Sequence, residues 1–466
     1  MSFCRTVFSL HCICTMVVSM NETQRTLPTT MPAQHAQQAQ SAHQGDWRPL
    51  SVSARLGRLQ FHNSGKFRVL QLADIQDGPK VDKDTIKLIS ACLDAARPDV
   101  VVFSGNQIAG YDTAYAATFR KRRWTVAWNR VRTQNADRFA ADLEHTRGLV
   151  RSQIAQFVQP LIDRGIPWAV TYGNHDFQCG LDNAESDAIY REFPGCLNPE
   201  STAASPGHPR IQPSSGLPEQ RIFPCEPGTF ALPVLDDERR RAVIALVLLD
   251  SGDYSPLGGY GVPSDRALTF LHSISGLLGV RSMVFQHFPL PQHYELLKEV
   301  LATADHAVEG YRAFAGHHYV IDETKTLPGS YLGEGVSCPD HDCGEFDLMK
   351  DGEGCFALSA GHDHRNRFVG TLDGILLAAT PTCGFGSYGP APAQRAARLF
   401  EFDIRHPFAP RTQLLEFDEL VGKPSNRKAY TYALNDTAAS PGETMDLLRK
   451  PGLVSRIAKR LRGIGQ

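Results

Sequence analysis

Five segments of the sequence each combine a strand-like apolar run with a group of metal-binding residue types directly after it. The five groups are Asp74-Ile-Gln76, Gly105-Asn106, Gly173-Asn174-His175-Asp176, His287 and Gly361-His362-Asp363-His364. Because ligands of open α/β sheets bind at the carboxyl ends of the strands, the five groups are expected to converge. Imidazoles and carboxylates bind Zn, Fe or Mn. One such motif alone is more often structural, but five in order predict a metal site.

The spacing of apolar residues predicts an α/β fold. Phe67–Leu72 alternates like a strand, Thr85–Ala96 has one apolar helical face, and Val100–Phe103 is typical of a buried strand. A strand, helix and strand in this order form a βαβ unit with parallel strands. A further helix is predicted at 149–162, and further strands at 166–172, 242–249, 283–286 and 355–359.

The composition is that of an ordinary globular protein. The 466 residues include 42% hydrophobic and 21% charged residues, and the formal net charge is −2. This charge gives no indication of bulk attraction to nucleic acid or to an anionic membrane. No internal stretch approaches the ~20 apolar residues of a transmembrane helix.

The two ends of the chain differ from its centre. Residues 1–19 fit a secretory signal peptide, and a disordered start is the alternative. Residues 20–50 contain almost no large apolar side chains, and we expect a disordered linker at 20–55 before a folded domain at 56–435. Residues 436–466 form a basic tail. We expect a secreted protein or one in the secretory pathway, and otherwise a cytoplasmic one.

Cysteine content supports export. Eight cysteines remain after residues 1–19, and four of them lie in Gly/Pro-rich loops where disulfides would be useful. These four are Cys196, Cys225, Cys338 and Cys343.

The ordered motifs resemble those of the calcineurin-like metallophosphoesterase superfamily. They are most similar to the branch with small purple-acid-phosphatase-like proteins of plants and their fungal relatives. Gly361-His-Asp-His-Arg-Asn366 and Thr382-Cys-Gly-Phe-Gly-Ser-Tyr-Gly389 support this resemblance, which covers residues 65–405. It implies a four-layer α/β/β/α sandwich with mixed sheets and a dinuclear metal site at one edge.

The resemblance also implies roles for individual residues. One divalent ion (Mn, Fe or Zn) would be bound by Asp74, Gln76, Asn106 and His364, and a second by Asn106, Asn174, His287 and His362. His175 would bind the substrate phosphate and assist the leaving group, with Asp176 orienting its ring. The nucleophile would be a metal-bound hydroxide.

Two positions depart from the family pattern. Gln76 stands where the family has histidine, and Asn106 stands where it has the bridging aspartate. A bridging carboxylate offsets part of the repulsion between two dications, whereas an amide carries no charge. We therefore expect an impaired dinuclear site with one or two ions per chain.

These features predict a metal-dependent phosphoesterase, a hydrolase acting on phosphate esters of small molecules or phosphoproteins, with reduced activity. The alternative is a pseudophosphatase that binds phosphorylated partners without turnover. The basic run 120–123 either meets an anionic substrate or forms a solvated turn.

Overall fold

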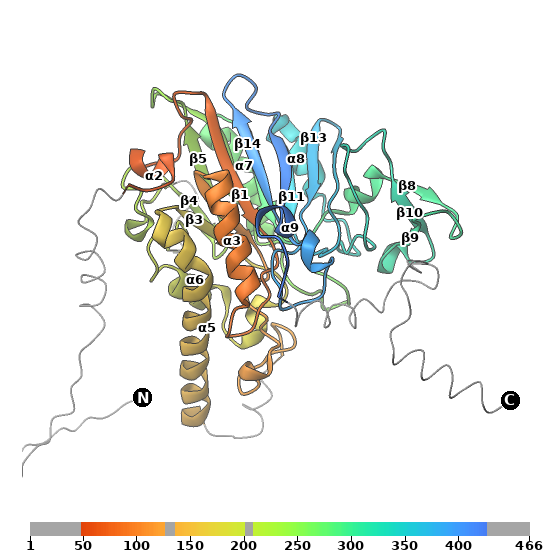
Figure 1. Cartoon of the computed structure of the whole chain (residues 1–466), viewed down its shortest axis with the longest axis horizontal. Coiled ribbons are helices and arrows are strands. Elements are labelled where there is room, and N and C mark those ends of the chain that lie inside the picture. The colour runs from red at the N-terminus through yellow and green to blue at the C-terminus, as the bar shows by residue number, and fades with distance from the viewer. Residues whose placement is uncertain (1–47, 126–135, 201–207, 426–466) are drawn as a thin grey trace, which may run out of the picture. The chain divides into compact units, whose positions relative to one another are not determined.

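The computed structural model describes residues 48–125, 136–200 and 208–425. Within these residues the strands form two large sheets and one small one (Figure 1). The predicted signal peptide, most of the predicted linker and the basic tail lie outside the described residues.

The first large sheet contains the predicted βαβ unit. Its order is β15 (Arg411–Glu416), β14 (Ala396–Asp403), β1 (Lys66–Leu72), β2 (Val100–Ser104) and β3 (Trp168–Thr171). Strands β1, β2 and β3 are parallel, and β14 and β15 run antiparallel. Helix α3 (Lys83–Ala96) connects β1 to β2 and begins two residues before the predicted start, because the Asp82 side chain accepts the Asp84 N–H as a cap.

The second large sheet contains the other predicted buried strands. Its order is β12 (Val369–Leu372), β13 (Ile375–Ala379), β11 (Cys355–Ala360), β7 (Ser282–Gln286), β6 (Ala242–Leu248), β5 (Thr229–Leu235) and β4 (Phe223–Glu226). The four central strands are parallel and the outer ones antiparallel. Both large sheets are therefore mixed, as predicted.

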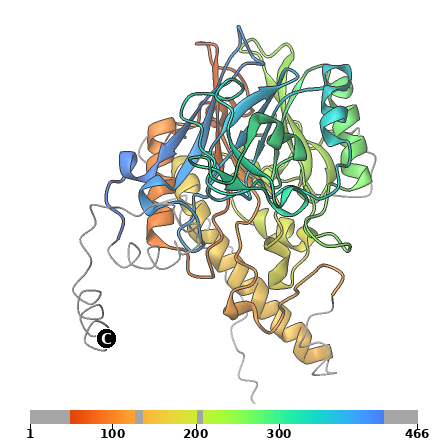
Figure 2. The same ribbon diagram turned by 90° about the vertical axis from the view of Figure 1, so that its right-hand side faces the viewer.

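Helices cover the outer face of each large sheet, and the two sheets pack against each other (Figure 2). Helices α3 and α5 (Ala136–Arg164) lie on the first sheet, and α7 (Asp265–Leu278) and α8 (Glu345–Lys350) lie on the second. The predicted four-layer α/β/β/α sandwich is confirmed.

Three cores fill the spaces between the four layers. Side chains of β1 alternate between two of them: Val69 enters the core between the sheets, and Leu70 enters the core beneath α3 and α5. In β2, Val102 enters the core between the sheets and Phe103 enters the core beneath α3 and α5. A strand with both faces buried has apolar residues in a continuous run, which is why 100–103 could be recognised from the sequence.

The remaining elements are shorter. They are α2 (Val52–Leu56), α6 (Asn183–Tyr190), α9 (Phe417–Leu420) and a small sheet of β8 (Leu297–Val300), β10 (His318–Ile321) and β9 (Val308–Glu309). The predicted linker extends too far, because α2 lies within it. Ser53 is buried there, and its backbone N–H and hydroxyl both bond to the Asp99 carboxylate.

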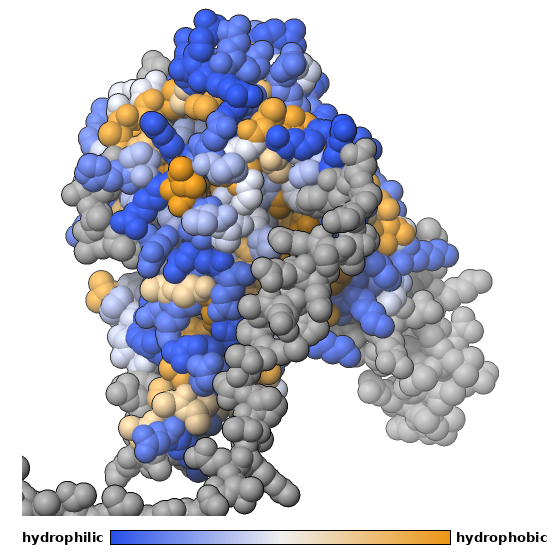
Figure 3. Space-filling model, turned by 90° about the vertical axis from the view of Figure 1, so that its left-hand side faces the viewer, coloured by the Kyte–Doolittle hydropathy of each residue, from blue (hydrophilic) through white to orange (hydrophobic). Residues whose placement is uncertain are grey.

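All eight cysteines among the described residues are free thiols. The disulfides expected in the loops are therefore absent there, and this argument for export is lost. No helix in the described part of the chain is long and apolar enough to cross a membrane. On the face shown in Figure 3, apolar residues occur in small groups between hydrophilic ones.

Candidate metal centre

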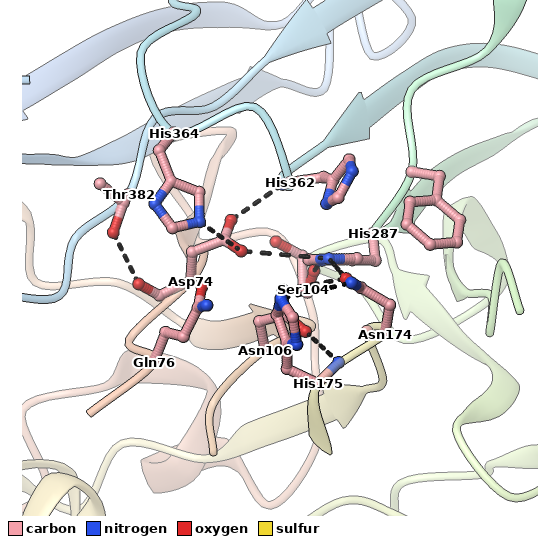
Figure 4. Close-up of polar contacts among 12 residues, drawn as sticks. Asp74, Gln76, Ser104, Asn106, Asn174, His175, His287, His362, His364 and Thr382 are labelled. Atoms are coloured by element: carbon pink, nitrogen blue, oxygen red, sulfur yellow. Dashed lines mark hydrogen bonds and ion pairs between the residues drawn. The ribbon is translucent and has the colours of Figure 1, made fainter. Parts of the chain in front are cut away.

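The structure brings together all seven side chains predicted as metal ligands (Figure 4). They follow the carboxyl ends of strands from both large sheets: β1, β2 and β3 in one, and β7 and β11 in the other. The seven are Asp74, Gln76, Asn106, Asn174, His287, His362 and His364. The expected convergence at one edge of the sheets is thus observed, with His175 beside it.

Four of these residues have left-handed backbone conformations. Their φ angles are 53° for Asp74, 42° for Gln76, 54° for Asn106 and 71° for His362. Non-glycine residues rarely adopt positive φ, and such conformations cluster at functional sites. Two backbone hydrogen bonds hold the first two loops together: Asp74 N–H donates to Gly105 O, and Gln76 N–H donates to Asn106 O.

Two glycines allow the loops to approach His287 closely. A Cβ at Gly173 would lie 2.4 Å from Asn106 Oδ1 and 2.7 Å from His287 Nε2. A Cβ at Gly105 would lie 2.5 Å from His287 Nδ1. Both separations are shorter than van der Waals contact, so any larger residue would displace the imidazole.

Asp74 directs one carboxylate oxygen into the centre. Its Oδ2 accepts the His362 backbone N–H at 2.8 Å. Its Oδ1 is buried without a hydrogen-bond partner, 3.4 Å from His364 Nε2 and 4.0 Å from His287 Nε2. Burial opposes ionisation of Asp74, and positive charge on the imidazoles of His287 and His364 would hold the pKa of this carboxyl below its usual range.

The two imidazoles beside Asp74 present lone pairs to it. His287 Nδ1 lies 3.1 Å from the carbonyl oxygen of Ser104, and His364 Nδ1 lies 2.6 Å from that of Tyr388. Since carbonyl oxygens only accept, each Nδ1 carries a proton, and in the neutral form of the ring Nε2 is an acceptor. Burial lowers the pKa of His287, which favours this neutral form.

A chain of amide hydrogen bonds places a third acceptor in the same space. Asn106 Oδ1 accepts the His175 backbone N–H, so Asn106 Nδ2 donates to Asn174 Oδ1. Asn174 Nδ2 in turn donates to the Tyr254 hydroxyl. Asn174 Oδ1 therefore faces His287 Nε2 at 3.1 Å, two acceptors with no proton between them.

Two further buried acceptors at the centre have no hydrogen-bond partner. They are Gln76 Oε1, whose Nε2 donates to the Tyr111 hydroxyl, and His362 Nε2. Burial lowers the pKa of His362 well below its usual value, so this imidazole is also neutral. Clustered lone pairs that lack donors are costly unless a cation lies between them.

The separations between these atoms can be compared with those around a single metal ion. Donor atoms bound to one ion at about 2.1 Å lie roughly 3.0–3.5 Å apart, close to the separations of 3.1 and 3.4 Å observed here. Within the described residues, however, no three His, Cys, Asp or Glu side chains are spaced as a complete metal-binding group. Amide oxygens must therefore complete the coordination, and the Nδ2 of Asn106, a donor, faces the Asn174 oxygen where the bridging oxygen was expected.

His175 is held by Gln178 rather than by Asp176. His175 Nδ1 lies 2.7 Å from Gln178 Oε1, and burial lowers the pKa of His175 to about 4. The Asp176 carboxylate accepts the backbone N–H groups of Asn106, Ile108 and Gly173. The predicted orienting role of Asp176 is therefore wrong, because its side chain turns toward the loop backbones.

The residues that touch the centre and that the sequence prediction missed include Gln178, Tyr111 and Tyr254. Gln178 follows His175 by three positions in the 3₁₀ turn Asp176–Cys179, and side chains three apart eclipse in such a turn. That spacing could have identified it. Tyr111 and Tyr254 lie in loops whose positions no local pattern indicates.

Comparisons with known proteins agree with this fold. The sequence model of a family described as calcineurin-like phosphoesterase matches residues 67–366. A protein of Arabidopsis thaliana named probable inactive purple acid phosphatase 14 is 22% identical over 368 residues, covering 74% of this chain and 78% of its own. The phosphatase DCR2 of Saccharomyces cerevisiae is 25% identical over 349 residues, covering 69% of this chain and 47% of its own.

Solved structures of similar proteins include a dimetal phosphatase from Danio rerio. It has 10% sequence identity and a TM-score of 0.36, covering 75% of this chain and 99% of its own.

Proposed function

The chain belongs to the calcineurin-like phosphoesterase family, and from this membership we propose that it hydrolyses phosphate esters, with one metal ion per chain and reduced turnover. The observation that carries the proposal is three buried atoms without a hydrogen-bond partner, Asp74 Oδ1, Gln76 Oε1 and His362 Nε2. Asn174 Oδ1 and the Nε2 atoms of His287 and His364 lie beside them. Such a set is stable around a cation and costly without one.

Asp74 governs where the ion binds, because it is the only charged group among these donors. His287 and His364 lie nearest its free oxygen, and Asn174 Oδ1 lies beside His287. Gln76 and His362 complete the proposed set. A bound metal would supply positive charge that polarises the phosphoryl oxygens and would acidify a water molecule.

The chain's own residues position the substrate. His175 is neutral at pH 7, with its Nδ1 proton held by Gln178. An anionic phosphate beside the ring favours its protonated form, which donates a proton to the leaving oxygen. Asp176 keeps the loops after β2 and β3 at the correct separation through its three backbone hydrogen bonds.

Metal content and hydrolysis together test the proposal. Elemental analysis after dialysis against manganese, zinc or iron should give about one ion per chain, and phenyl phosphate should be hydrolysed slowly. His287→Ala should lose both the metal and the activity. His272→Ala is the matched control, because this histidine is half exposed on α7, next to Asp351. A metal-free wild type that is still active would contradict the proposal.

A second candidate function is phosphate binding without turnover. The orientation of Asn106 Nδ2 toward Asn174 favours this second function, since an N–H donor cannot bridge two metals. A relative named probable inactive purple acid phosphatase also favours it. Calorimetry with inorganic phosphate distinguishes the two candidates: binding by a metal-loaded protein with no hydrolysis of any phosphate ester would support this second function.

Entry into the secretory pathway stays a prediction from residues 1–19. N-terminal sequencing of the native protein decides it. An intact Met1 in a cytosolic fraction would contradict it.

A further inference from the structure

Four tyrosine rings contact four different side chains of the candidate metal centre. We infer that the centre accepts phosphate esters of aromatic alcohols, with tyrosine rings binding the aromatic group. This inference rests on the proposed function of the same site, and it names the substrate class that the function leaves open.

Three of the four candidate functional imidazoles each pack against a different tyrosine. The ring centroids are 4.8 Å apart for His175 and Tyr111, 4.4 Å for His362 and Tyr260, and 4.1 Å for His364 and Tyr388. The first two pairs are edge-to-face and the third is stacked. Tyr254 is the fourth, and its hydroxyl accepts the Asn174 Nδ2–H.

Two of these tyrosines extend from the buried centre to solvent. Tyr111 is 45% exposed and Tyr388 is 44% exposed, whereas His364 is only 2% exposed. Each ring therefore has one part on the centre and another part facing outward. A large apolar surface left open beside a polar site is available to a ligand that has both a charged and an apolar part.

The loop that carries Tyr254 and Tyr260 is firmly anchored. The two residues pair as an isolated antiparallel bridge, with their rings stacked at 27°. Arg123 forms ion pairs with Asp250 and Asp253 at the base of this loop. The rings are thus in place before a ligand binds, which lowers the entropic cost of binding.

Arg122 adds a positive charge to the same wall. Its guanidinium lies 3.6 Å from the centroid of the Tyr254 ring. Of the basic run 120–123, this residue is placed to meet an anionic ligand, while Arg123 is occupied by two carboxylates. The run does lie in a turn, as the predicted alternative has it, and Arg122 and Arg123 are partly buried there.

The geometry favours an aromatic ring close to the phosphate. A phosphoryl group bound among the acceptor side chains places its ester substituent at the level of the four tyrosines, which adjoin those side chains. Aromatic pairs in offset or edge-to-face contact add affinity beyond area burial, corresponding to about tenfold. A saturated ring of equal size would lack this additional affinity.

Calorimetry with two non-hydrolysable phosphonates tests the inference. Benzylphosphonate and cyclohexylmethylphosphonate have the same charge and carbon count, and they differ in aromaticity. The metal-loaded protein should bind benzylphosphonate about tenfold more tightly. Tyr260→Leu and Tyr111→Leu should each reduce this ratio toward one, and because both phosphonates are measured on the same variant, a change in phosphate affinity common to both cancels in the ratio. Tyr260→Phe keeps the ring and should keep the ratio.

Phe408→Leu is the matched control. Phe408 is also exposed (40%) and also has a guanidinium near its ring, that of Arg281 at 5.0 Å, but it lines a separate cavity with Ala242 and Ser275. The ratio should not change in this variant.

The possible results separate this inference from the proposed function. Equal affinity for the two phosphonates, with phosphate still bound, would overturn the inference alone. A preference for benzylphosphonate without hydrolysis of phenyl phosphate would support the inference and contradict the proposed turnover. No binding of phosphate or of either phosphonate would overturn both. Phenyl phosphate and a phosphotyrosine peptide, compared with a phosphoserine peptide, then show whether the natural aromatic ester is a small molecule or a protein side chain.

Discussion

The Oε1 atom of Gln178 lies 2.7 Å from Nδ1 of His175, across a single 3₁₀ turn. The carbonyl end of the amide accepts the ring proton and leaves Nε2 as the atom that faces Asn174 at 3.3 Å. Gln178 is itself fixed, because its Nε2 donates to Lys121 O. The ring that we propose to act on the substrate is therefore oriented from the segment between β2 and α5 as well as from the loop after β3.

Gln178→Met should lower kcat about tenfold with little change in KM, because the ring loses its orientation while the phosphate site remains. Gln178→Glu keeps an acceptor oxygen and should restore most of kcat. Its added charge should also raise the pKa of His175 and move the pH profile upward. Steady-state kinetics from pH 4 to 8 measure all three effects. An equal loss in both variants would assign Gln178 a purely structural role.

Gly173→Ala should release the metal without unfolding the protein. The added Cβ would lie 2.7 Å from His287 Nε2, so the imidazole must move out of the centre. The affinity for the metal should fall at least about tenfold, and elemental analysis after dialysis should therefore show less bound metal than in the wild type. Gly148→Ala is the matched control, because a Cβ there has no atom within 4 Å and the residue lies inside α5. The control should keep its metal and gain up to ~1 kcal/mol of stability.

The approximate positions of the strands and of the metal-binding loops could be predicted because both depend on short-range patterns. Buried runs such as 100–103 mark strands, and side chains after strand ends meet at a sheet edge. The direction of a side chain within a loop could not be predicted. Asp176 turns to backbone N–H groups instead of His175, and Asn106 turns its Nδ2 to Asn174, because contacts between distant segments decide these rotamers. The positive φ of Asp74 could not be predicted from the sequence for the same reason.

Glu345 should make the stability of the protein depend on pH. This residue is buried at the start of α8, and burial raises the pKa of Glu345 to about 8. A hydrogen bond with the Gln286 side chain opposes this shift, but burial outweighs it. In the unfolded chain the carboxyl titrates at about 4.3. Between these two values the folded state binds the extra proton, so stability is greatest below the lower value and is lost as pH rises to about 8.

The free energy of unfolding should therefore fall by up to about 1.4 kcal/mol per pH unit in that window. Glu345→Gln should remove this part of the slope and make the protein more stable than the wild type at pH 8. Urea denaturation of both proteins at pH 5, 6.5 and 8 measures the free energy of unfolding and its dependence on pH. Parallel curves for the two proteins would show that Glu345 does not carry the extra proton.

Repair of the two departures from the family pattern should restore a dinuclear site. In Asn106→Asp, one carboxylate oxygen can keep the His175 N–H bond while the second replaces Nδ2 and offers charge to both metals. Two dications 3.5 Å apart repel by roughly 20 kcal/mol at an effective dielectric of about 20, so this charge matters more than the imidazole that Gln76→His returns. Asn106→Asp alone should therefore help more than Gln76→His alone. The two changes should act together rather than add, because both serve the same metal.

The double variant should bind two ions per chain and gain at least about tenfold in kcat, since the change affects the chemical step. Elemental analysis and phenyl phosphate hydrolysis with manganese, zinc or iron measure both quantities. His287→Ala in the repaired protein should abolish the gain, because His287 Nε2 lies 4.0 Å from Asp74 Oδ1 and is one of the proposed metal ligands. Wild-type turnover equal to that of the double variant would mean that the natural site needs no carboxylate bridge. Two ions per chain without a rise in kcat would mean that the amide of Asn106 is not what limits turnover, and it would favour phosphate binding as the function of the natural protein.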